Sequence, residues 1–186
     1  MDAPHNKPAI WTIGHSNRPI EEFIRLLNSN QIEGVADVRR FPGSRKYPQF
    51  GLESLSETLT QTGIVYRHMP KLGGRRTPRK DSQNDAWRNA AFRGYADYME
   101  TDDFDTGIRE LRKFASTKRV SIMCAEALWW QCHRSLIADY LKAHGYHVMH
   151  IISQAKTQEH PFTSAARLVN GSLNYSAAGH EQELSL

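Results

Sequence analysis

The sequence has little cysteine and no long apolar segment. Only two cysteines occur among its 186 residues, and they stand close together at positions 124 and 132. No apolar run approaches the roughly 20 residues that a membrane-spanning helix requires. The first ten residues, MDAPHNKPAI, lack the basic segment followed by an apolar one that marks a secretory signal. We therefore expect a cytoplasmic protein whose two cysteines are thiols rather than a structural disulfide.

Internal repeats and a second candidate core are also missing. A hydrophobic content of 39% with a mean hydropathy of −0.61 is ordinary for a globular chain in water. A chain of this length can form one domain with a sizeable core, with or without a tail. We expect a single domain over residues 9–152, followed by a polar C-terminal extension over residues 153–186.

Positive charge, in contrast, is abundant and concentrated in two segments. The net charge is +4, with an isoelectric point near 9.1. Residues 66–93 hold eight basic and two acidic side chains, and residues 39–47 hold four basic side chains and no acidic one. Such concentration is typical of a surface that binds phosphate or another polyanion, although two solvated loops would look the same.

Apolar strands alternate with amphipathic helices along most of the chain. Short apolar runs predict strands at residues 9–14, 34–39, 64–69, 119–124 and 146–152. Helical spacing predicts helices that begin at Pro19 and that cover residues 52–62, 91–99, 104–114 and 132–144. This alternation predicts a single three-layer, Rossmann-like α/β domain with a mostly parallel sheet of about five strands. The dipeptide Asn170-Gly171 predicts a hairpin within residues 167–175 of the C-terminal extension.

A long basic loop interrupts this alternation at residues 70–90. It contains Pro70, Gly73, Gly74 and Pro78, which cannot continue a helix or a central strand. A loop of this length inside a compact domain is typically functional or disordered. We expect the loop to lie at the surface beside the strand ends.

Polar side chains follow the carboxyl ends of the predicted strands, which is where ligands bind in an open parallel sheet. The opposite ends of the strands offer almost no reactive group. As ligand-binding or anion-binding residues at this edge we expect Gly14, Ser16, Asp37, Arg39, Ser44, Gly73, Gly74, Arg75, Trp129, Trp130 and Arg134.

The stretch SIMCAEALWWQCHR, residues 121–134, holds both thiols at the same predicted edge. Its last residues begin a predicted helix, where free backbone N–H groups favour phosphate binding and thiol ionisation. The candidate catalytic residues are Cys124, Glu126, Cys132, His15 and His133. Other interpretations stay open: Cys124 as a core residue, Glu126 as the partner of an arginine, and the two tryptophans as an apolar lid. A metal site formed by Cys124, Cys132 and His133 is a further alternative, which the gap between the cysteines disfavours because it differs from that of common zinc knuckles. We predict no metal ligand and no cofactor.

Taken together, the motifs resemble one known family, the domain of unknown function 488. The resemblance extends in order over about residues 9–152, through TIGHS (12–16), DVR (37–39) with Pro42 and Ser44, LGG (72–74), Phe92 with Tyr95 and Met99, MCAE (123–126), CHR (132–134) and His150-Ile151. It implies an α/β, Rossmann-like fold. It also implies that Cys124, Glu126, Cys132, His133 and Arg134 belong to a family motif, but it names no reaction.

We therefore expect an enzyme that acts on a phosphate-bearing substrate, either a nucleotide or nucleic acid. Arg39, Arg75 and Arg134 would hold the anionic group, and a cysteine thiolate would react. The alternative is a non-catalytic nucleic-acid-binding module, in which the basic loop grips the backbone and a tryptophan stacks on a base. A thiol redox sensor is a third hypothesis. No membrane partner is expected, and the sequence leaves the oligomeric state open.

Overall fold

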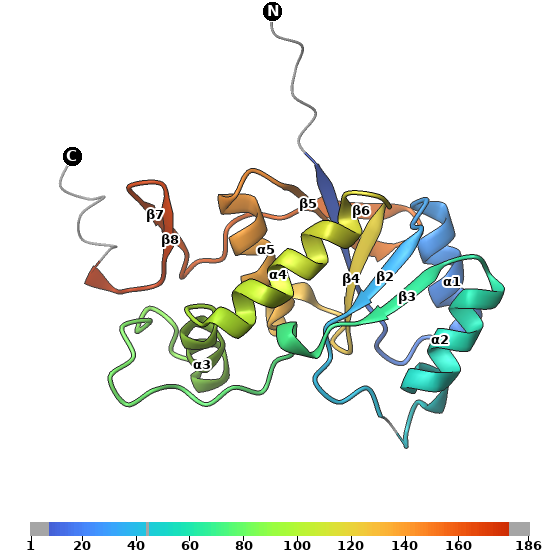
Figure 1. Ribbon diagram of the computed structural model, residues 1–186, viewed down its shortest axis with the longest axis horizontal. Coiled ribbons are helices and arrows are strands. Elements are labelled where there is room, and N and C mark those ends of the chain that lie inside the picture. Colours follow the sequence, from blue (N-terminus) through green and yellow to red (C-terminus); the bar gives the residue numbers. More distant parts are fainter. Residues whose placement is uncertain (1–7, 44, 179–186) are drawn as a thin grey trace, which may run out of the picture.

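The computed structural model describes residues 8–43 and 45–178, and its centre is a six-stranded sheet (Figure 1). The strands are β1 (Ala9–Gly14), β2 (Gly34–Asp37), β3 (Val65–His68), β4 (Val120–Cys124), β5 (His147–Ser153) and β6 (Lys156–Glu159). Their order across the sheet is β3-β2-β4-β1-β5-β6. Neighbours among β1 to β5 pair in parallel, and β6 pairs with β5 in the antiparallel sense. The predicted mostly parallel sheet is confirmed.

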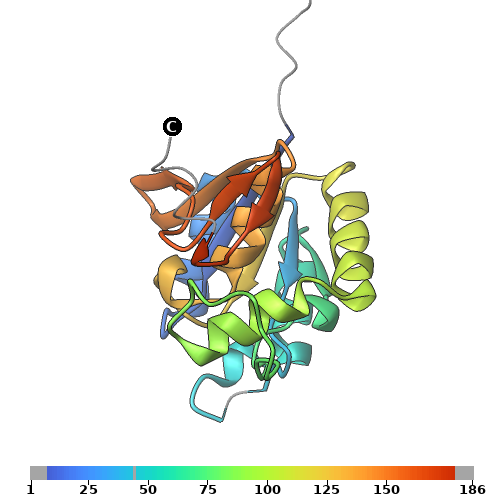
Figure 2. The same ribbon diagram turned by 90° about the vertical axis from the view of Figure 1, so that its left-hand side faces the viewer.

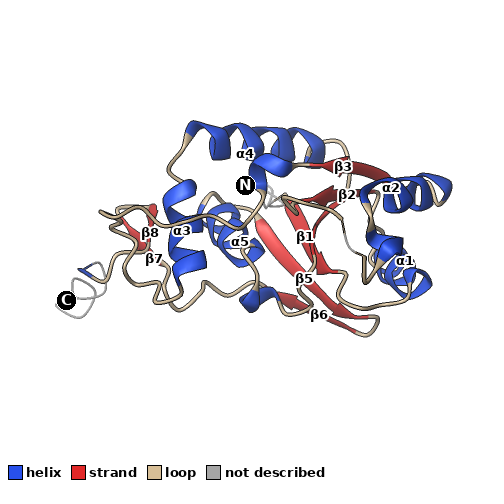
Figure 3. Cartoon of the chain, turned by 90° about the horizontal axis from the view of Figure 1, so that it is seen from below, coloured by secondary structure: helices blue, strands red, loops and turns tan. Residues whose placement is uncertain are grey.

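Helices cover both faces of this sheet, which gives the expected three layers (Figure 3). They are α1 (Ile20–Ser29), α2 (Leu52–Gln61), α3 (Ala90–Tyr98), α4 (Asp102–Ala115) and α5 (Arg134–Ala143). The α1 and α2 helices lie on one face, α4 and α5 lie on the other, and α3 packs beside α5. Because successive strand residues point to opposite faces, Ile10 joins the core under α4 and Trp11 joins the core under α1. No helix in the described ranges is long and apolar enough to cross a membrane.

The segment after β5 adds an edge strand and a hairpin. The β6 strand has the sequence KTQE, which carries no apolar pattern, and for this reason it was not predicted. The expected hairpin forms from β7 (Arg167–Val169) and β8 (Ser172–Asn174). Both residues of its turn, Asn170 and Gly171, have positive φ angles, as a tight hairpin turn requires. The hairpin lies at the end of the molecule away from α1 and α2 (Figures 1 and 2).

A buried carboxylate on α5 binds this C-terminal segment to the domain. Asp139 is fully buried. One of its oxygens accepts hydrogen bonds from His160 and from the backbone N–H of Thr163, both at 2.9 Å. The other oxygen accepts from the hydroxyl groups of Thr163 at 2.6 Å and Tyr175 at 2.9 Å. Three residues beyond β5 thus satisfy one charge in the core.

The long basic loop has a defined path along α3. Near its start, the buried Tyr95 hydroxyl donates to the carbonyl of Leu72 over 2.7 Å. Further on, Asp97 accepts hydrogen bonds from Ser82 and from the backbone N–H of Arg79, at 2.6 and 2.8 Å. These contacts fix the loop at the surface, where the sequence placed it, and they bring its glycines to the ends of the strands.

Candidate functional site

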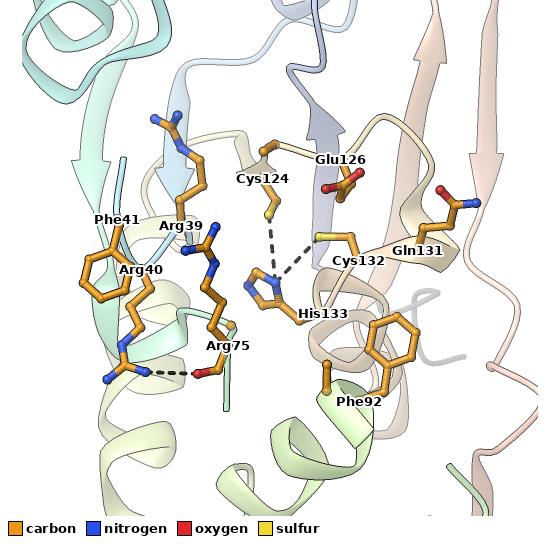
Figure 4. Close-up of a pocket in the computed structure, with 13 residues that line it drawn as sticks. Arg39, Arg40, Phe41, Arg75, Phe92, Cys124, Glu126, Gln131, Cys132 and His133 are labelled. Atoms are coloured by element: carbon orange, nitrogen blue, oxygen red, sulfur yellow. Dashed lines mark hydrogen bonds between the residues drawn. The ribbon is translucent and has the colours of Figure 1, made fainter. Parts of the chain in front are cut away.

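A pocket of about 350 Å³ opens beyond the carboxyl ends of the parallel strands (Figure 4). Strands β2 and β4 lead into it, and the basic loop, α3 and the turn before α5 complete its wall. It is lined by Arg39, Arg40, Phe41, Gly74, Arg75, Ala91, Phe92, Cys124, Ala125, Glu126, Gln131, Cys132 and His133. The edge at which the sequence gathers titratable groups is therefore the edge that carries a pocket.

Both thiols point at one nitrogen of His133 (Figure 4). The Nδ1 atom of His133 lies 3.9 Å from the Cys124 sulfur and 3.7 Å from the Cys132 sulfur. On the far side of the ring, Nε2 lies 3.2 Å from the carbonyl oxygen of Val38. Because a carbonyl only accepts, Nε2 carries the proton and Nδ1 presents its lone pair to the sulfurs.

The two cysteines have opposite pKa shifts. Burial alone raises the pKa of Cys132. The neighbouring Cys124 thiol, the Arg134 charge and the Arg134 backbone N–H outweigh burial, however, and lower the pKa to about 7. The interaction with Cys132 and burial together raise the pKa of Cys124. Cys132 is thus the residue that supplies a thiolate near neutral pH, with Cys124 as its proton-bearing neighbour.

Arg39 and Asp37 form a buried ion pair beside the pocket. The guanidinium contacts both carboxylate oxygens, at 2.9 and 2.6 Å, and the Tyr66 hydroxyl donates to the same carboxylate at 2.6 Å. Arg39 also donates to the carbonyl of Phe50 and contacts Nε2 of His15, at 2.8 and 3.2 Å. Within the described residues, four of its five N–H donors are therefore engaged with protein.

His15 and Ser16 line a second hollow of about 500 Å³ that adjoins the pocket. The two hollows share Arg39, Phe41, Arg75, Ala125 and Glu126. Burial lowers the pKa of His15 to about 4, against a smaller opposite effect of its hydrogen bond to the Ser16 carbonyl. The ring is therefore neutral at physiological pH, with its Nδ1–H donating to Ser16 and its Nε2 facing Arg39.

Arg134 is buried and holds the loop between the two cysteines by hydrogen bonds, an arrangement that we call the Arg134 clamp. Only 1% of it is exposed, and its guanidinium donates to the backbone carbonyls of Glu126 and Ala127. Gly14 faces the same stretch, because a Cβ there would overlap the Glu126 carbonyl. Both residues shape the loop between the two cysteines from behind the pocket.

The side chains that remain available to a ligand are on the pocket rim. Arg40, Arg75 and Glu126 are exposed, and within the described residues no hydrogen bond or ion pair engages the Arg75 guanidinium. Arg75 has a φ of 59°, a left-handed conformation that is uncommon outside glycine, and Arg40 donates to its carbonyl over 3.1 Å. Strained backbone of this kind is frequent at ligand sites.

The glycines of the LGG motif allow close packing at this rim. A Cβ on Gly74 would lie 2.7 Å from Nδ1 of His133, and one on Gly73 would lie 2.8 Å from Cβ of Arg40. The absence of a side chain at both positions lets the loop approach the imidazole and the first rim arginine.

The two tryptophans have different environments. Trp129 is buried, stacks on His150 with ring centroids 4.5 Å apart, and donates to Gln158. Trp130 is 48% exposed and contacts Trp129 edge to face. Neither belongs to the lining of the pocket. Ser44, the remaining candidate, lies outside the described residues.

Sequence reasoning missed several residues of the lining. Arg40 and Phe41 directly follow the expected Arg39, so the strand-end rule extended by two positions would have included them. Phe92 stands in the family motif but was given no role. Gln131 ends a short 3-10 helix, Trp129–Gln131, just before Cys132, and the helical pattern of the sequence did not indicate this helix.

Comparison with known proteins gives one match. The family model described as "Domain of unknown function DUF488" matches residues 19–141. Comparisons with curated proteins and with solved structures give no match.

Proposed function

We propose that this chain, which belongs to the family described as "Domain of unknown function DUF488", is an enzyme that acts on a phosphate-bearing substrate. The observation that carries the proposal is the content of the pocket. Two thiols, an imidazole, a carboxylate and exposed arginines, which come from segments far apart in the sequence, line a single space at the carboxyl edge of the sheet. Convergence of reactive groups in one concave site is the usual mark of an active site.

The arginines on the rim support an anionic substrate. Arg40 and Arg75 present planar, forked N–H donors, which match the oxygens of a phosphate group. The charge of Arg39 is balanced by Asp37, so Arg39 would orient the substrate more than attract it by charge. The two adjoining hollows share Arg75, and together they give room for a nucleotide or a nucleic-acid end.

The chemistry of this enzyme depends on the thiolate of Cys132. Close to its sulfur lie the Cys124 thiol, the His133 imidazole and the Arg134 backbone N–H, and Glu126 lines the same pocket. A cytoplasmic location fits this assignment, because thiols remain reduced there.

A substrate screen with matched variants tests the proposal. The purified protein is incubated with a mixture of nucleotides, short single-stranded oligonucleotides and simple phosphomonoesters, and the compounds are followed by mass spectrometry. We expect the wild type to convert at least one phosphate-bearing class and Cys132→Ala to convert none. Arg75→Ala should weaken substrate binding roughly tenfold to a hundredfold, the loss of one charge-assisted hydrogen bond. Arg25→Ala, at an exposed position on α1 that lines neither hollow, serves as the control.

A binding module would give a different result. Trp130 and Phe41 are 48% and 65% exposed, so both are available to stack on a base. Tight binding of single-stranded oligonucleotides without turnover, unchanged in Cys132→Ala, would favour that function and contradict the enzyme.

A further inference from the structure

We propose that Cys124, Cys132 and His133 form a three-ligand site for Zn²⁺ whose fourth coordination position is open to the pocket. The inference deepens the proposed function and rests on it in one respect, because the open position is where a substrate oxygen would bind. The site itself is argued from the geometry of the three side chains alone.

The three ligand atoms form a triangle of the right size. The two sulfur–nitrogen distances are 3.9 and 3.7 Å, and all three atoms lie within 4.8 Å of one another. With Zn–S of about 2.3 Å and Zn–N of about 2.0–2.1 Å, neighbouring ligands of a tetrahedral ion are roughly 3.5–3.8 Å apart. Shifts of at most about 1 Å, mainly between the two sulfurs, would bring all three atoms onto one ion.

The imidazole is held in the tautomer that metal binding needs. Its Nε2–H donates to the carbonyl of Val38, the residue just after β2, which leaves the Nδ1 lone pair directed at the sulfurs. In metal-binding histidines, a hydrogen bond from the second ring nitrogen to a backbone carbonyl is common, and it fixes both the tautomer and the ring orientation.

The positions of the ligands are fixed by the fold around them. Cys124 ends β4, and Cys132 and His133 directly precede α5. Arg134 holds the carbonyls of the intervening loop, and the Tyr95 ring packs on His133 with centroids 4.9 Å apart. Because the three side chains are already held in place, little ordering is needed when an ion binds.

The number of ligands indicates an open site rather than a structural one. Structural zinc sites have four protein ligands, whereas catalytic sites have three and leave one position for water or substrate. Among the described residues, the cluster contains no fourth cysteine, histidine or carboxylate. All three ligands line the pocket, together with Arg75 and Glu126. The spacing of these three residues in the sequence disfavoured a metal site, because the ligands come from a strand end and a helix start rather than from one zinc knuckle.

A cobalt titration of metal-free protein tests the site. We expect one Co²⁺ per chain, with a thiolate-to-cobalt charge-transfer band in the near ultraviolet and intense visible bands of four-coordinate geometry, and displacement by Zn²⁺. Cys124→Ser, Cys132→Ser and His133→Ala should each weaken Zn²⁺ binding by more than about 100-fold, beyond the effect typical of residues that only hydrogen-bond to a metal ligand. His144→Ala, an exposed histidine elsewhere, should leave binding unchanged.

A second measurement on the wild type avoids dependence on variants that fail to fold. Iodoacetamide labelling followed by mass spectrometry should modify Cys132 in the metal-free protein, and one equivalent of Zn²⁺ should protect it. A wild type that gives no charge-transfer band and no protection by Zn²⁺ overturns the site.

Phosphate separates this inference from the proposed function. Inorganic phosphate added to the cobalt-loaded protein should change the visible bands, and Arg75→Ala should reduce that change. If cobalt binds as expected but phosphate changes neither the bands nor the melting temperature, the metal site stands and the phosphate-bearing substrate is wrong. If phosphate stabilises a protein that binds no metal, the substrate class stands and the metal site is wrong.

Discussion

At the scale of single residues, two arginines of the same edge have opposite roles. The charge of Asp37 is fully buried and is balanced by Arg39, whereas Arg75 is exposed on the rim. We predict that Arg39→Leu lowers the free energy of unfolding by about 3–5 kcal/mol, because it leaves a buried carboxylate without its partner. Arg75→Leu should change it by less than about 0.5 kcal/mol, as surface substitutions do. Urea denaturation followed by circular dichroism measures both, and equal losses would contradict this division of roles.

The buried histidines predict a loss of stability in acid. The pKa of His15 is lowered by burial to about 4 from an ordinary value of 6.5, so the folded protein binds its proton less readily than the unfolded chain. The resulting stability is fully present above about pH 6.5 and is lost as the pH falls toward 4, by up to roughly 3 kcal/mol. His150, whose pKa burial lowers to about 2, adds to the loss in the same direction.

Variants separate the contribution of His15 from that of other groups. His15→Gln should lose less unfolding free energy than the wild type between pH 7 and pH 4, although it is less stable at pH 7. His144→Gln, at an exposed position, should follow the wild type. Equal acid losses in His15→Gln and the wild type would show that other groups cause the effect.

At the scale of elements, the sequence predicts the alternation of strands and helices and the positions of the strand ends, but not the hydrogen-bond partners of polar side chains. The five parallel strands appear at the predicted places, because buried strands between amphipathic helices leave a clear apolar pattern. The pattern contains no information on what a polar side chain contacts. Arg39 and Arg134 were expected to face a ligand, and the fold directs them to Asp37 and to backbone carbonyls. Asp37 lies only two positions before Arg39 in the sequence, but residue types alone do not reveal that the two side chains pair. The partners of Arg134 lie on the main chain, which no residue type reveals.

The connection between β4 and α5 depends on the Arg134 clamp. Arg134→Met keeps most of the side-chain volume and removes both hydrogen bonds to the loop. We predict faster amide hydrogen exchange over residues 125–131, with the amides in the middle of α5 unchanged, because the helix has its own packing against the sheet. Exchange measured by mass spectrometry checks this. Unchanged protection of the loop would show that packing of Gly14 suffices to hold it.

At the scale of the whole molecule, the folding unit is larger than the segment that matches the family model. The match covers residues 19–141. The β1 strand precedes this segment entirely, although it lies between β4 and β5 in the middle of the sheet. The β1 strand also supplies Gly14 and, just beyond its end, His15. A parallel strand in the centre of a sheet is buried on both sides and cannot be omitted. The matched segment is therefore only part of the domain, because it lacks the central strand β1.

The same reasoning applies to the segment after β5, and it gives the last prediction. Asp139 has hydrogen bonds from His160, Thr163 and Tyr175, and His150 contacts His160 over 2.9 Å. A chain that ends at Ser153 loses all of these partners together with β6. It also loses Tyr175 from the apolar core cluster that contains the buried residues of α5. We predict that this truncated chain shows no cooperative unfolding transition in urea.

Two further chains make the truncation informative. A chain that ends at Ala178 keeps every contact just named, so it should unfold with the wild-type midpoint. Tyr175→Phe removes one hydrogen bond to a buried charge and should cost about 1.5–3 kcal/mol, which separates a local effect from loss of the whole segment. A truncated chain that unfolds cooperatively and still binds Co²⁺ with the wild-type spectrum would show that residues beyond Ser153 are an accessory. The pocket is lined by residues at the ends of β2 and β4 and in the turn before α5, the helix that carries Asp139. Loss of cooperative folding should therefore remove metal binding as well.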